Sequence, residues 1–388
     1  MVNLQSLQDE REAILALANG KVFYGTGFGA SKKVFGELVF TTFPGAGYNE
    51  ALTDPSNSGQ LYVLTYPLIG NYGVPSWETD EYGIPKYFES DSVKVTGFVV
   101  FEACKEPSHF ESKKTLDTFL KEQGVPGIEG IDTRHLTKIL RTEGVQLGLL
   151  WVFEKGEQIP SEEKLMMMLK KAPDPNTRHL VKEVSPKGIT IHSPKNPQGT
   201  VVLVDCGAKN NIKRSLLKYN LKVVVVPFDA SFETVMSYNP NGVVFSNGPG
   251  DPKMCVETID LCRRLINTNI PLMGICLGNQ ILGLAAGGDT YKLKFGHRGA
   301  NKPVIYKPTG RCYITSQNHG YAVDEQSVMA SGFEAIFINA DDKSIEGLIH
   351  KEKPIFSSQF HPEAWPGPED TCFLFEKFVK NMHLKTEV

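Results

Sequence analysis

A cysteine between two glycines is the residue in this sequence best suited to nucleophilic chemistry. Cys276 lies in the segment Gly-Ile-Cys-Leu-Gly at 274–278, between an apolar run that predicts a strand and a segment with helical spacing. Glycines allow the sharp turn that presents a nucleophile above a sheet edge. The start of a helix also stabilises a thiolate. Cys276 is therefore a candidate nucleophile, and an inert buried cysteine is the alternative.

A thiolate that attacks an amide needs a partner that takes and returns a proton. The segment His361-Pro362-Glu363 follows an apolar run and offers such a partner. Residues two apart in an extended segment point to the same side, so Glu363 is placed to orient the imidazole of His361. A histidine beside an acid is common, and this motif gains its weight from the cysteine upstream.

A third segment, Ser-Asn-Gly-Pro-Gly-Asp-Pro at 246–252, also follows an apolar run. Gly248 and Gly250 let backbone N–H groups approach a ligand. One of these groups, together with the N–H of Leu277, would form an oxyanion hole. An ordinary turn rich in glycine and proline is the alternative.

The elements around these segments alternate between strand and helix from residue 200 onward. Apolar runs at 201–205, 222–227, 242–246 and 270–275 are separated by helical patterns at 211–219 and 256–267. Strands that are apolar on both faces predict a mostly parallel sheet covered on two sides. The C-terminal part is therefore expected to be a doubly wound α/β domain, with its site at the carboxyl ends of the strands.

The N-terminal part has a different pattern of apolar stretches and turn residues, which predicts a smaller mixed β/α domain. Asn19-Gly20 lies between two short apolar stretches and favours a type I′ hairpin. Residues 155–199 are rich in turn formers, above all from residue 173, and predict a linker. The expected organisation is an N-terminal domain at 1–154, a linker at 155–199 and the α/β domain at 200–388.

Composition narrows the classes of function. The chain has 388 residues, of which 41% are hydrophobic and 22% charged, and a net charge of −3. This predicts a globular protein without the basic surface that binds nucleic acid or an anionic membrane. No apolar run approaches the ~20 residues that span a bilayer. The acidic start of the chain lacks a targeting signal, so we expect a cytoplasmic protein. The seven cysteines include no C-x-x-C pair, so no metal site is expected.

The three segments SNGPGDP, GICLGNQ and QFHPE, in this order, resemble the class I, triad-type glutamine amidotransferases. The resemblance implies that Cys276 is the nucleophile, that His361 acts first as general base and then as acid, and that Glu363 orients it. It also implies glutamine hydrolysis through a γ-glutamyl thioester, with no cofactor in this chain.

Segments in the N-terminal part indicate which kind of glutamine amidotransferase this sequence resembles. The segments GELVF at 36–40, GYNEALTDPS at 47–56, LTYPLIGN at 64–71 and GIDTR at 130–134 resemble the small, glutaminase subunit of carbamoyl-phosphate synthetases. The segment TSQNHGYAV at 315–323 is similar to a glutamine-binding loop of that family. The expected partner is a synthetase large subunit or domain, which would bind ATP and bicarbonate.

The resemblance also implies a glutamine pocket, with Ser56 reaching it from the N-terminal domain. Its expected members are Ser56, Gly248, Gly250, Leu277, Gln280, Asn318, Gly320 and Tyr321. An amino-acid substrate needs such hydroxyl, amide and backbone groups, because an unpaired buried charge is costly.

Two positions depart from the family pattern. Asn279 stands where many relatives have histidine, and we expect it to affect packing more than activity, since Cys276 and Gln280 are both present. The loop at 43–46 is one residue longer than usual, which bears on local geometry alone.

Other functions remain open at this point. One is a non-catalytic, regulatory glutaminase-like protein that lets a synthetase use free ammonia. Others are an amidotransferase for anthranilate, GMP or CTP synthesis, and a γ-glutamyl peptidase. The sequence does not distinguish pyrimidine from arginine biosynthesis, nor a free subunit from part of a longer polypeptide.

Overall fold

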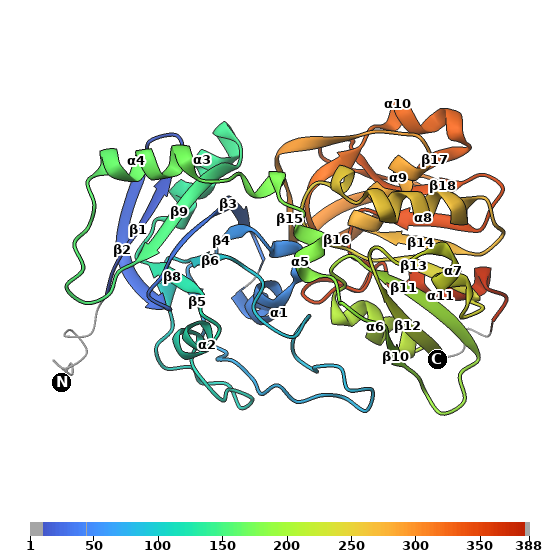
Figure 1. The fold of residues 1–388 in the computed structure, drawn as a ribbon, viewed down its shortest axis with the longest axis horizontal. Coiled ribbons are helices and arrows are strands. Elements are labelled where there is room, and N and C mark those ends of the chain that lie inside the picture. Colours follow the sequence, from blue (N-terminus) through green and yellow to red (C-terminus); the bar gives the residue numbers. More distant parts are fainter. Residues whose placement is uncertain (1–10, 44, 385–388) are drawn as a thin grey trace. The chain divides into compact units, whose positions relative to one another are not determined.

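The computed structural model describes residues 11–43 and 45–384, which form two compact units. Unit 1 comprises Met1–Trp77 and Asp91–Arg178, and unit 2 comprises Glu78–Ser90 and His179–Val388 (Figure 1). The acidic N-terminus and Pro44, in the loop expected to be longer, lie outside the described residues. Unit 2 therefore takes in a short segment from the N-terminal half of the sequence.

Unit 1 is built on a closed β-barrel with an apolar interior that includes Leu15, Leu61 and Leu150. Around the barrel its strands follow the order β1 (Arg11–Leu17), β2 (Val22–Gly29), β8 (Pro126–Glu129), β6 (Gly97–Val99), β4 (Gln60–Leu64), β3 (Lys33–Thr41) and β9 (Gln146–Val152). A separate pair joins β5 (Leu68–Ile69) to β7 (Glu102–Ala103). The helices are α1 (Tyr48–Thr53), α2 (Leu116–Glu122), α3 (Thr133–Glu143) and α4 (Glu162–Lys171), with short 3₁₀ turns η2 (Gly45–Gly47), η3 (Pro55–Asn57) and η4 (Pro175–Thr177).

The hairpin predicted at Asn19-Gly20 is confirmed, because β1 and β2 pair antiparallel on either side of it. Its predicted turn type is wrong. A type I′ turn needs positive φ at both central residues, and of these two only Gly20 has one, at 92°. The N–H of Gly20 donates to Leu17 O at 3.0 Å and the N–H of Leu17 to Lys21 O at 2.9 Å, as in a three-residue loop closed by a bulge.

Unit 2 is built on one large sheet. Its strands follow the order β10 (Thr190–His192), β12 (Leu221–Pro227), β11 (Gly199–Asp205), β13 (Gly242–Phe245), β14 (Leu272–Ile275), β19 (Ile355–Ser358), β18 (Ile345–His350), β17 (Phe333–Asn339), β15 (Thr290–Tyr306) and β16 (Arg311–Val323). The strands from β12 to β19 run parallel, and the flanking strands are antiparallel. The predicted fold class, a doubly wound and mostly parallel sheet after a smaller mixed domain, is confirmed.

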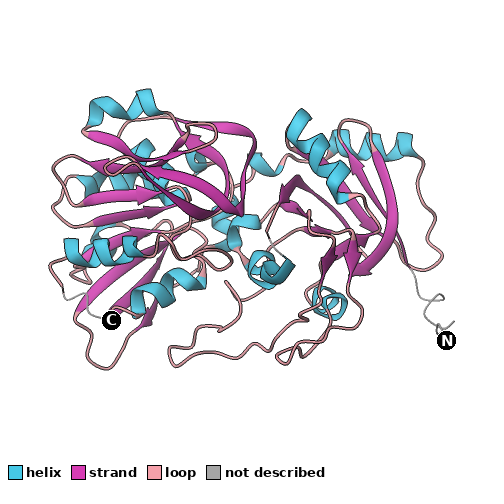
Figure 2. Cartoon of the chain, turned by 180° about the vertical axis from the view of Figure 1, so that it is seen from behind, coloured by secondary structure: helices cyan, strands magenta, loops and turns pink. Residues whose placement is uncertain are grey.

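Helices cover both faces of this sheet (Figure 2). One face packs α7 (Phe232–Met236), α8 (Val256–Ile266) and α9 (Leu277–Ala285), and the other packs α6 (Asn210–Leu217) and α11 (Phe373–Asn381). Alternate residues of β11 supply the two layers, since Val202 lies in the first cluster and Leu203 in the second. The remaining helices are α5 (Leu180–Val184) and α10 (Glu325–Val328), with 3₁₀ turns η5 (Pro252–Met254) and η6 (Met329–Ser331).

Residues 155–199, expected to be a linker, are shared between the units. In unit 1, Leu165 and Leu169 of α4 are buried against the outside of β1 and β9. In unit 2, β10 adds an edge strand beside β12. Such an edge strand needs few apolar residues, which is why its polar composition resembles that of a loop. Across 11–43 and 45–384, no helix is long and apolar enough to cross a membrane.

Candidate active site

Cys276 lies on a sharp turn between β14 and α9. Its backbone has a φ of 54° and a ψ of −101°, which is costly for a residue with a side chain. A Cβ on Gly274 would lie 2.5 Å from Gly278 O, and a Cβ on Gly278 would lie 2.2 Å from Phe245 O. Only glycine fits at these two places, so the flanking glycines permit the turn that the sequence predicts.

The thiol of Cys276 lies at the carboxyl end of the parallel strands. The residue is 2% exposed, its N–H donates to Ser358 O at 2.8 Å, and its Sγ lies 3.8 Å from Asn318 O. In the first turn of α9, the N–H groups of Gly278, Asn279 and Gln280 all donate to carbonyls. Leu277 is the first residue of the helix, where an N–H has no intrahelical acceptor, so this group is the one left for a ligand.

His361 and Glu363 form a buried pair beside the cysteine. Nδ1 of His361 lies 2.6 Å from Glu363 Oε1, and the N–H of His361 donates to Ser316 O at 2.9 Å. Within the described part of the chain, Nε2 of His361 is buried without a hydrogen-bond partner. Burial alone would lower the pKa of His361, but the charges of Glu363 and Cys276 outweigh it and raise the pKa to about 10. The imidazole therefore holds its proton at neutral pH.

Lys209 is a buried cation that the sequence analysis missed. Its Nζ lies 3.2 Å from Glu363 Oε1 and donates to Ala364 O, and its N–H donates to Asn247 Oδ1 at 3.0 Å. Burial tends to raise the pKa of Glu363, but Lys209 and His361 together lower it to about 2. Glu363 is thus a carboxylate held charged between two cations. The signal available in the sequence was a lysine four residues after a buried strand.

Glu89 lies in the segment Glu78–Ser90 and packs on α6. Its carboxylate accepts from Arg214 Nη2 at 2.5 Å and from the N–H of Asn211 at 3.0 Å. Burial raises its pKa, although Lys209 and Arg214 lower it. The side chain of Asn211 donates to Glu363 O, so this segment is joined to Glu363 through Asn211.

The loop at 246–252 lies against the cysteine turn. The N–H of Gly278 donates to Ser246 O at 3.0 Å. A Cβ on Gly248 would lie 2.2 Å from Cys206 O and 2.7 Å from Leu277, and Gly250 has a φ of 86°. Both predicted glycines are therefore required by the backbone, and the structure brings Gly248 and Leu277 together.

The segment 315–323 forms most of β16 and lies on the other side of the site. Gln280 donates from Nε2 to Tyr321 O at 2.9 Å and to Gln359 Oε1 at 3.2 Å, so its amide holds this strand. Asn318 approaches the thiol, as described above. A Cβ on Gly320 would lie 3.3 Å from Arg298. Of the predicted pocket, Gln280, Asn318, Gly320 and Tyr321 thus lie on α9 and β16 of one unit.

Asn279 is adjacent to Gln280 and shares its acceptor, Gln359 Oε1. Asn279 is fully buried, donates to Gln359 Oε1 at 2.9 Å and accepts from Ser357 Oγ at 2.8 Å. It joins α9 to β19, in keeping with the packing role expected for it. Ser56 belongs to unit 1, in η3, where its N–H donates to Asp54 Oδ1 at 2.9 Å. Its contribution to glutamine binding stays a prediction.

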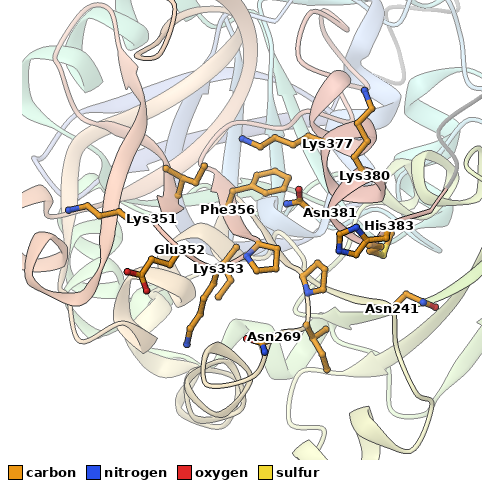
Figure 3. Close-up of a pocket in the computed structure, with 16 residues that line it drawn as sticks. Asn241, Asn269, Lys351, Glu352, Lys353, Phe356, Lys377, Lys380, Asn381 and His383 are labelled. Carbon is orange, nitrogen blue, oxygen red and sulfur yellow. The ribbon is translucent and has the colours of Figure 1, made fainter.

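A separate pocket of about 630 Å³ lies at the opposite ends of the parallel strands (Figure 3). Pro271 and Pro354 line it and precede β14 and β19, whereas Cys276 follows β14. Lysines surround the pocket, and Lys377 lies over the ring of Phe356 at 5.1 Å. The pocket is therefore distinct from the triad.

The pKa shifts predict how the site responds to pH. Replacing Glu363 with glutamine removes a charge that raises the pKa of His361. We expect the alkaline limb of the pH profile for the expected glutamine hydrolysis, where His361 loses its proton, to move to lower pH. Profiles of kcat/KM for Glu363→Gln and for Glu334→Gln, an exposed control on β17, would check this. An alkaline limb that does not move would contradict the assignment.

The pKa shifts of His361 and Glu363 also make the stability of the fold depend on pH. The raised pKa of His361 stabilises the fold below its ordinary pKa of 6.5, and this contribution is lost as the pH rises toward about 10. The lowered pKa of Glu363 stabilises the fold above 4.5, and this is lost as the pH falls toward about 2. The pair is therefore expected to be most stabilising where both groups are charged.

Comparisons with known proteins agree with this geometry. Residues 202–381 match the family model described as glutamine amidotransferase class-I, and residues 15–150 match that of the carbamoyl-phosphate synthase small chain, CPSase domain. The chain is 48% identical over 371 residues to a carbamoyl phosphate synthase small chain of Methanocaldococcus jannaschii, covering 95% of this chain and 98% of that protein.

Two further relatives give the same result. The small chain of Methanopyrus kandleri is 47% identical over 95% of this chain and 98% of its own length. An arginine-specific small chain of Chaetomium globosum is 45% identical over 96% of this chain and 79% of its own length. Because these likenesses span both units, the chain belongs to the family of carbamoyl phosphate synthase small chains.

Proposed function

We propose that this protein is the glutaminase component of a carbamoyl-phosphate synthase. It hydrolyses L-glutamine to glutamate and ammonia, and it delivers the ammonia to a synthetase large subunit or domain. The observation that carries the proposal is Cys276 on its positive-φ turn beside the buried pair of His361 and Glu363. Nucleophile, proton carrier and orienting carboxylate are the three parts that covalent amide hydrolysis needs.

In the first half of the reaction, the sulfur of Cys276 attacks the side-chain amide carbon of glutamine. The tetrahedral oxyanion accepts hydrogen bonds from the N–H of Leu277 and of Gly248; Gly248 lies against the side chain of Leu277. His361 acts first as general base, by taking the proton of the Cys276 thiol, and then as acid, by giving that proton to the amide nitrogen, so that the C–N bond breaks and ammonia leaves. A γ-glutamyl thioester on Cys276 remains.

In the second half, water attacks the thioester. The imidazole of His361 is now neutral and accepts a proton from the water through Nε2, while Glu363 holds Nδ1. The C–S bond breaks, glutamate leaves and the starting protonation state returns. Because Nε2 has no hydrogen-bond partner among the described residues, it is free to serve both steps.

The glutamine pocket proposed for this site combines backbone and side-chain groups. Asn318, Gly320 and Tyr321 are proposed to contribute from β16; the carbonyl of Asn318 approaches Cys276, and that of Tyr321 accepts from Gln280. Ser56 is proposed to contribute from unit 1. No cofactor is proposed for the reaction in this chain, since ATP and bicarbonate belong to the partner. A cytoplasmic location stays a prediction.

Transfer of labelled nitrogen tests the proposal. We would combine the full chain with the large chain of a carbamoyl-phosphate synthase, ATP, bicarbonate and glutamine labelled with ¹⁵N at its side-chain amide. Labelled carbamoyl phosphate is expected, even when unlabelled ammonium is present in solution. Label found only in free ammonia would refute delivery, and no glutamate at all would refute the glutaminase.

A further inference from the structure

Three buried side chains on neighbouring strands of unit 2 form a cluster outside the triad. His297 lies on β15, His319 on β16 and Glu346 on β18, with exposures of 8%, 4% and 0%. Each offers one atom that can hold a metal ion, and these atoms all lie within 4.8 Å of one another. None of the three has a role in the mechanism proposed above.

The hydrogen bonds of His319 determine which of its nitrogens carries the proton. Nδ1 lies 2.8 Å from Tyr321 O, and a carbonyl only accepts, so Nδ1 is the donor. In the neutral ring this is the only N–H. Its Nε2 therefore bears a lone pair. This atom lies 3.8 Å from Glu346 Oε1 and 3.3 Å from Gln317 Oε1, and both of these atoms are acceptors.

His297 has the complementary arrangement. Its Nε2 lies 2.8 Å from Asp342 Oδ2 and donates to that carboxylate, and its Nδ1 lies 3.2 Å from Glu346 Oε1. Glu346 Oε1 accepts from Asn339 Nδ2 at 2.9 Å. Among the described residues, Glu346 Oε2 is buried without a hydrogen-bond partner.

A proton between His297 Nδ1 and Glu346 Oε1 serves that one pair of atoms, and His297 Nδ1 also lies 3.4 Å from Asn339 Nδ2. His319 Nε2 then remains beside two oxygen atoms, and Glu346 Oε2 has no partner among the described residues. A divalent cation accepts electron pairs from all of them at once. Two imidazoles and one carboxylate are a ligand set that zinc takes in proteins. Gln317 Oε1 is placed to serve as a fourth ligand.

The outer contacts match those of protein metal sites. Metal-binding histidines usually donate their second N–H to a carboxylate or a backbone carbonyl, and ligating carboxylates are themselves hydrogen-bonded. Here Asp342 accepts from His297, Tyr321 O accepts from His319, and Asn339 donates to Glu346. We propose that His297, His319 and Glu346 bind a zinc-type divalent metal ion. No short motif marks this site in the sequence, because its ligands come from three separate strands.

The ion would stabilise the strand that approaches the nucleophile. His319 directly follows Asn318, whose carbonyl lies 3.8 Å from the Cys276 sulfur. A metal on His319 would therefore hold β16 at the position that glutamine binding requires. This role is structural, and the ion takes no part in the bond-breaking steps.

Metal content of the full chain tests the proposal. Protein stripped with a chelator would be dialysed against zinc chloride, and bound zinc measured by elemental analysis. We expect about one zinc per chain, which the variants His297→Gln and His319→Gln lose. His135→Gln, an exposed histidine on α3, is the matched control and should keep the ion, as should Cys276→Ser, which removes the reactive thiol.

Asp342→Asn provides a second test if a ligand variant fails to fold, because this carboxylate is 45% exposed and is not itself a proposed ligand. Its Oδ2 contacts the outer nitrogen of His297, and its Oδ1 accepts from the N–H and the hydroxyl of Ser344. Its zinc affinity should fall about 10- to 100-fold. Cobalt(II) in place of zinc should give the visible absorption of a four-coordinate site. The proposal would be overturned if the wild-type protein binds no zinc. It would also be overturned if His297→Gln and Asp342→Asn both retain as much zinc as the wild-type protein.

Discussion

Replacing Cys276 with alanine should abolish glutamine-dependent synthesis of carbamoyl phosphate while synthesis from ammonia continues. Loss of a triad member in a serine protease lowers kcat by roughly 10⁴- to 10⁶-fold, and a comparable loss is expected here. Ammonia reaches the synthetase partner without passing through the thioester, so that activity does not depend on the sulfur. The measurement is the rate of carbamoyl phosphate formation with each nitrogen source.

The control for this variant is Cys312→Ala, since Cys312 is exposed and lies far from the turn in sequence. It should keep both activities. Mass spectrometry adds a second test, because a γ-glutamyl adduct should form on wild-type protein and be absent from Cys276→Ala. If glutamine-dependent synthesis survives in Cys276→Ala, the triad assignment fails. If wild-type protein itself shows none, the regulatory alternative is favoured.

Lys209→Met should give the second large effect, this time on both stability and catalysis. The substitution leaves the fully buried carboxylate of Glu363 without the cation that lies 3.2 Å away. Removing one partner of a buried ion pair typically costs about 3–5 kcal/mol. We also expect a lower kcat, because a carboxylate with a raised pKa orients His361 less firmly. Denaturant unfolding and glutaminase kinetics would measure the two effects.

A double-mutant cycle separates the ion pair from simple loss of packing. Lys209→Met with Glu363→Gln should be more stable than Lys209→Met alone, because the second change removes the uncompensated charge. The exposed Lys218, near the end of α6, provides the control variant Lys218→Met, which should change little. Additive free energies in the cycle would show that Lys209 and Glu363 do not interact.

The sequence alone predicted the candidate reactive groups of this protein and determined the class of its fold. Cys276, His361 and Gly248 each follow a buried parallel strand, and such strands end at a common edge of the sheet. The candidate catalytic residues therefore lie in short local segments, which can be recognised without knowing any distance between atoms. The alternation of strands and helices likewise predicted a sheet covered on both faces, because the spacing of apolar residues indicates which faces of each element are buried.

The tertiary structure decided which groups surround these residues. Lys209 is 154 positions before Glu363 in the sequence, and Glu89 reaches α6 from the N-terminal half. The ion pairs of these two residues could not be predicted from local pattern, because an ion pair depends on distance in space and not on spacing along the chain. For Lys209 the local signal was only a lysine four residues after a buried strand. For the same reason the sequence did not predict the cluster of His297, His319 and Glu346, because the strands that carry these residues come together only in the folded sheet.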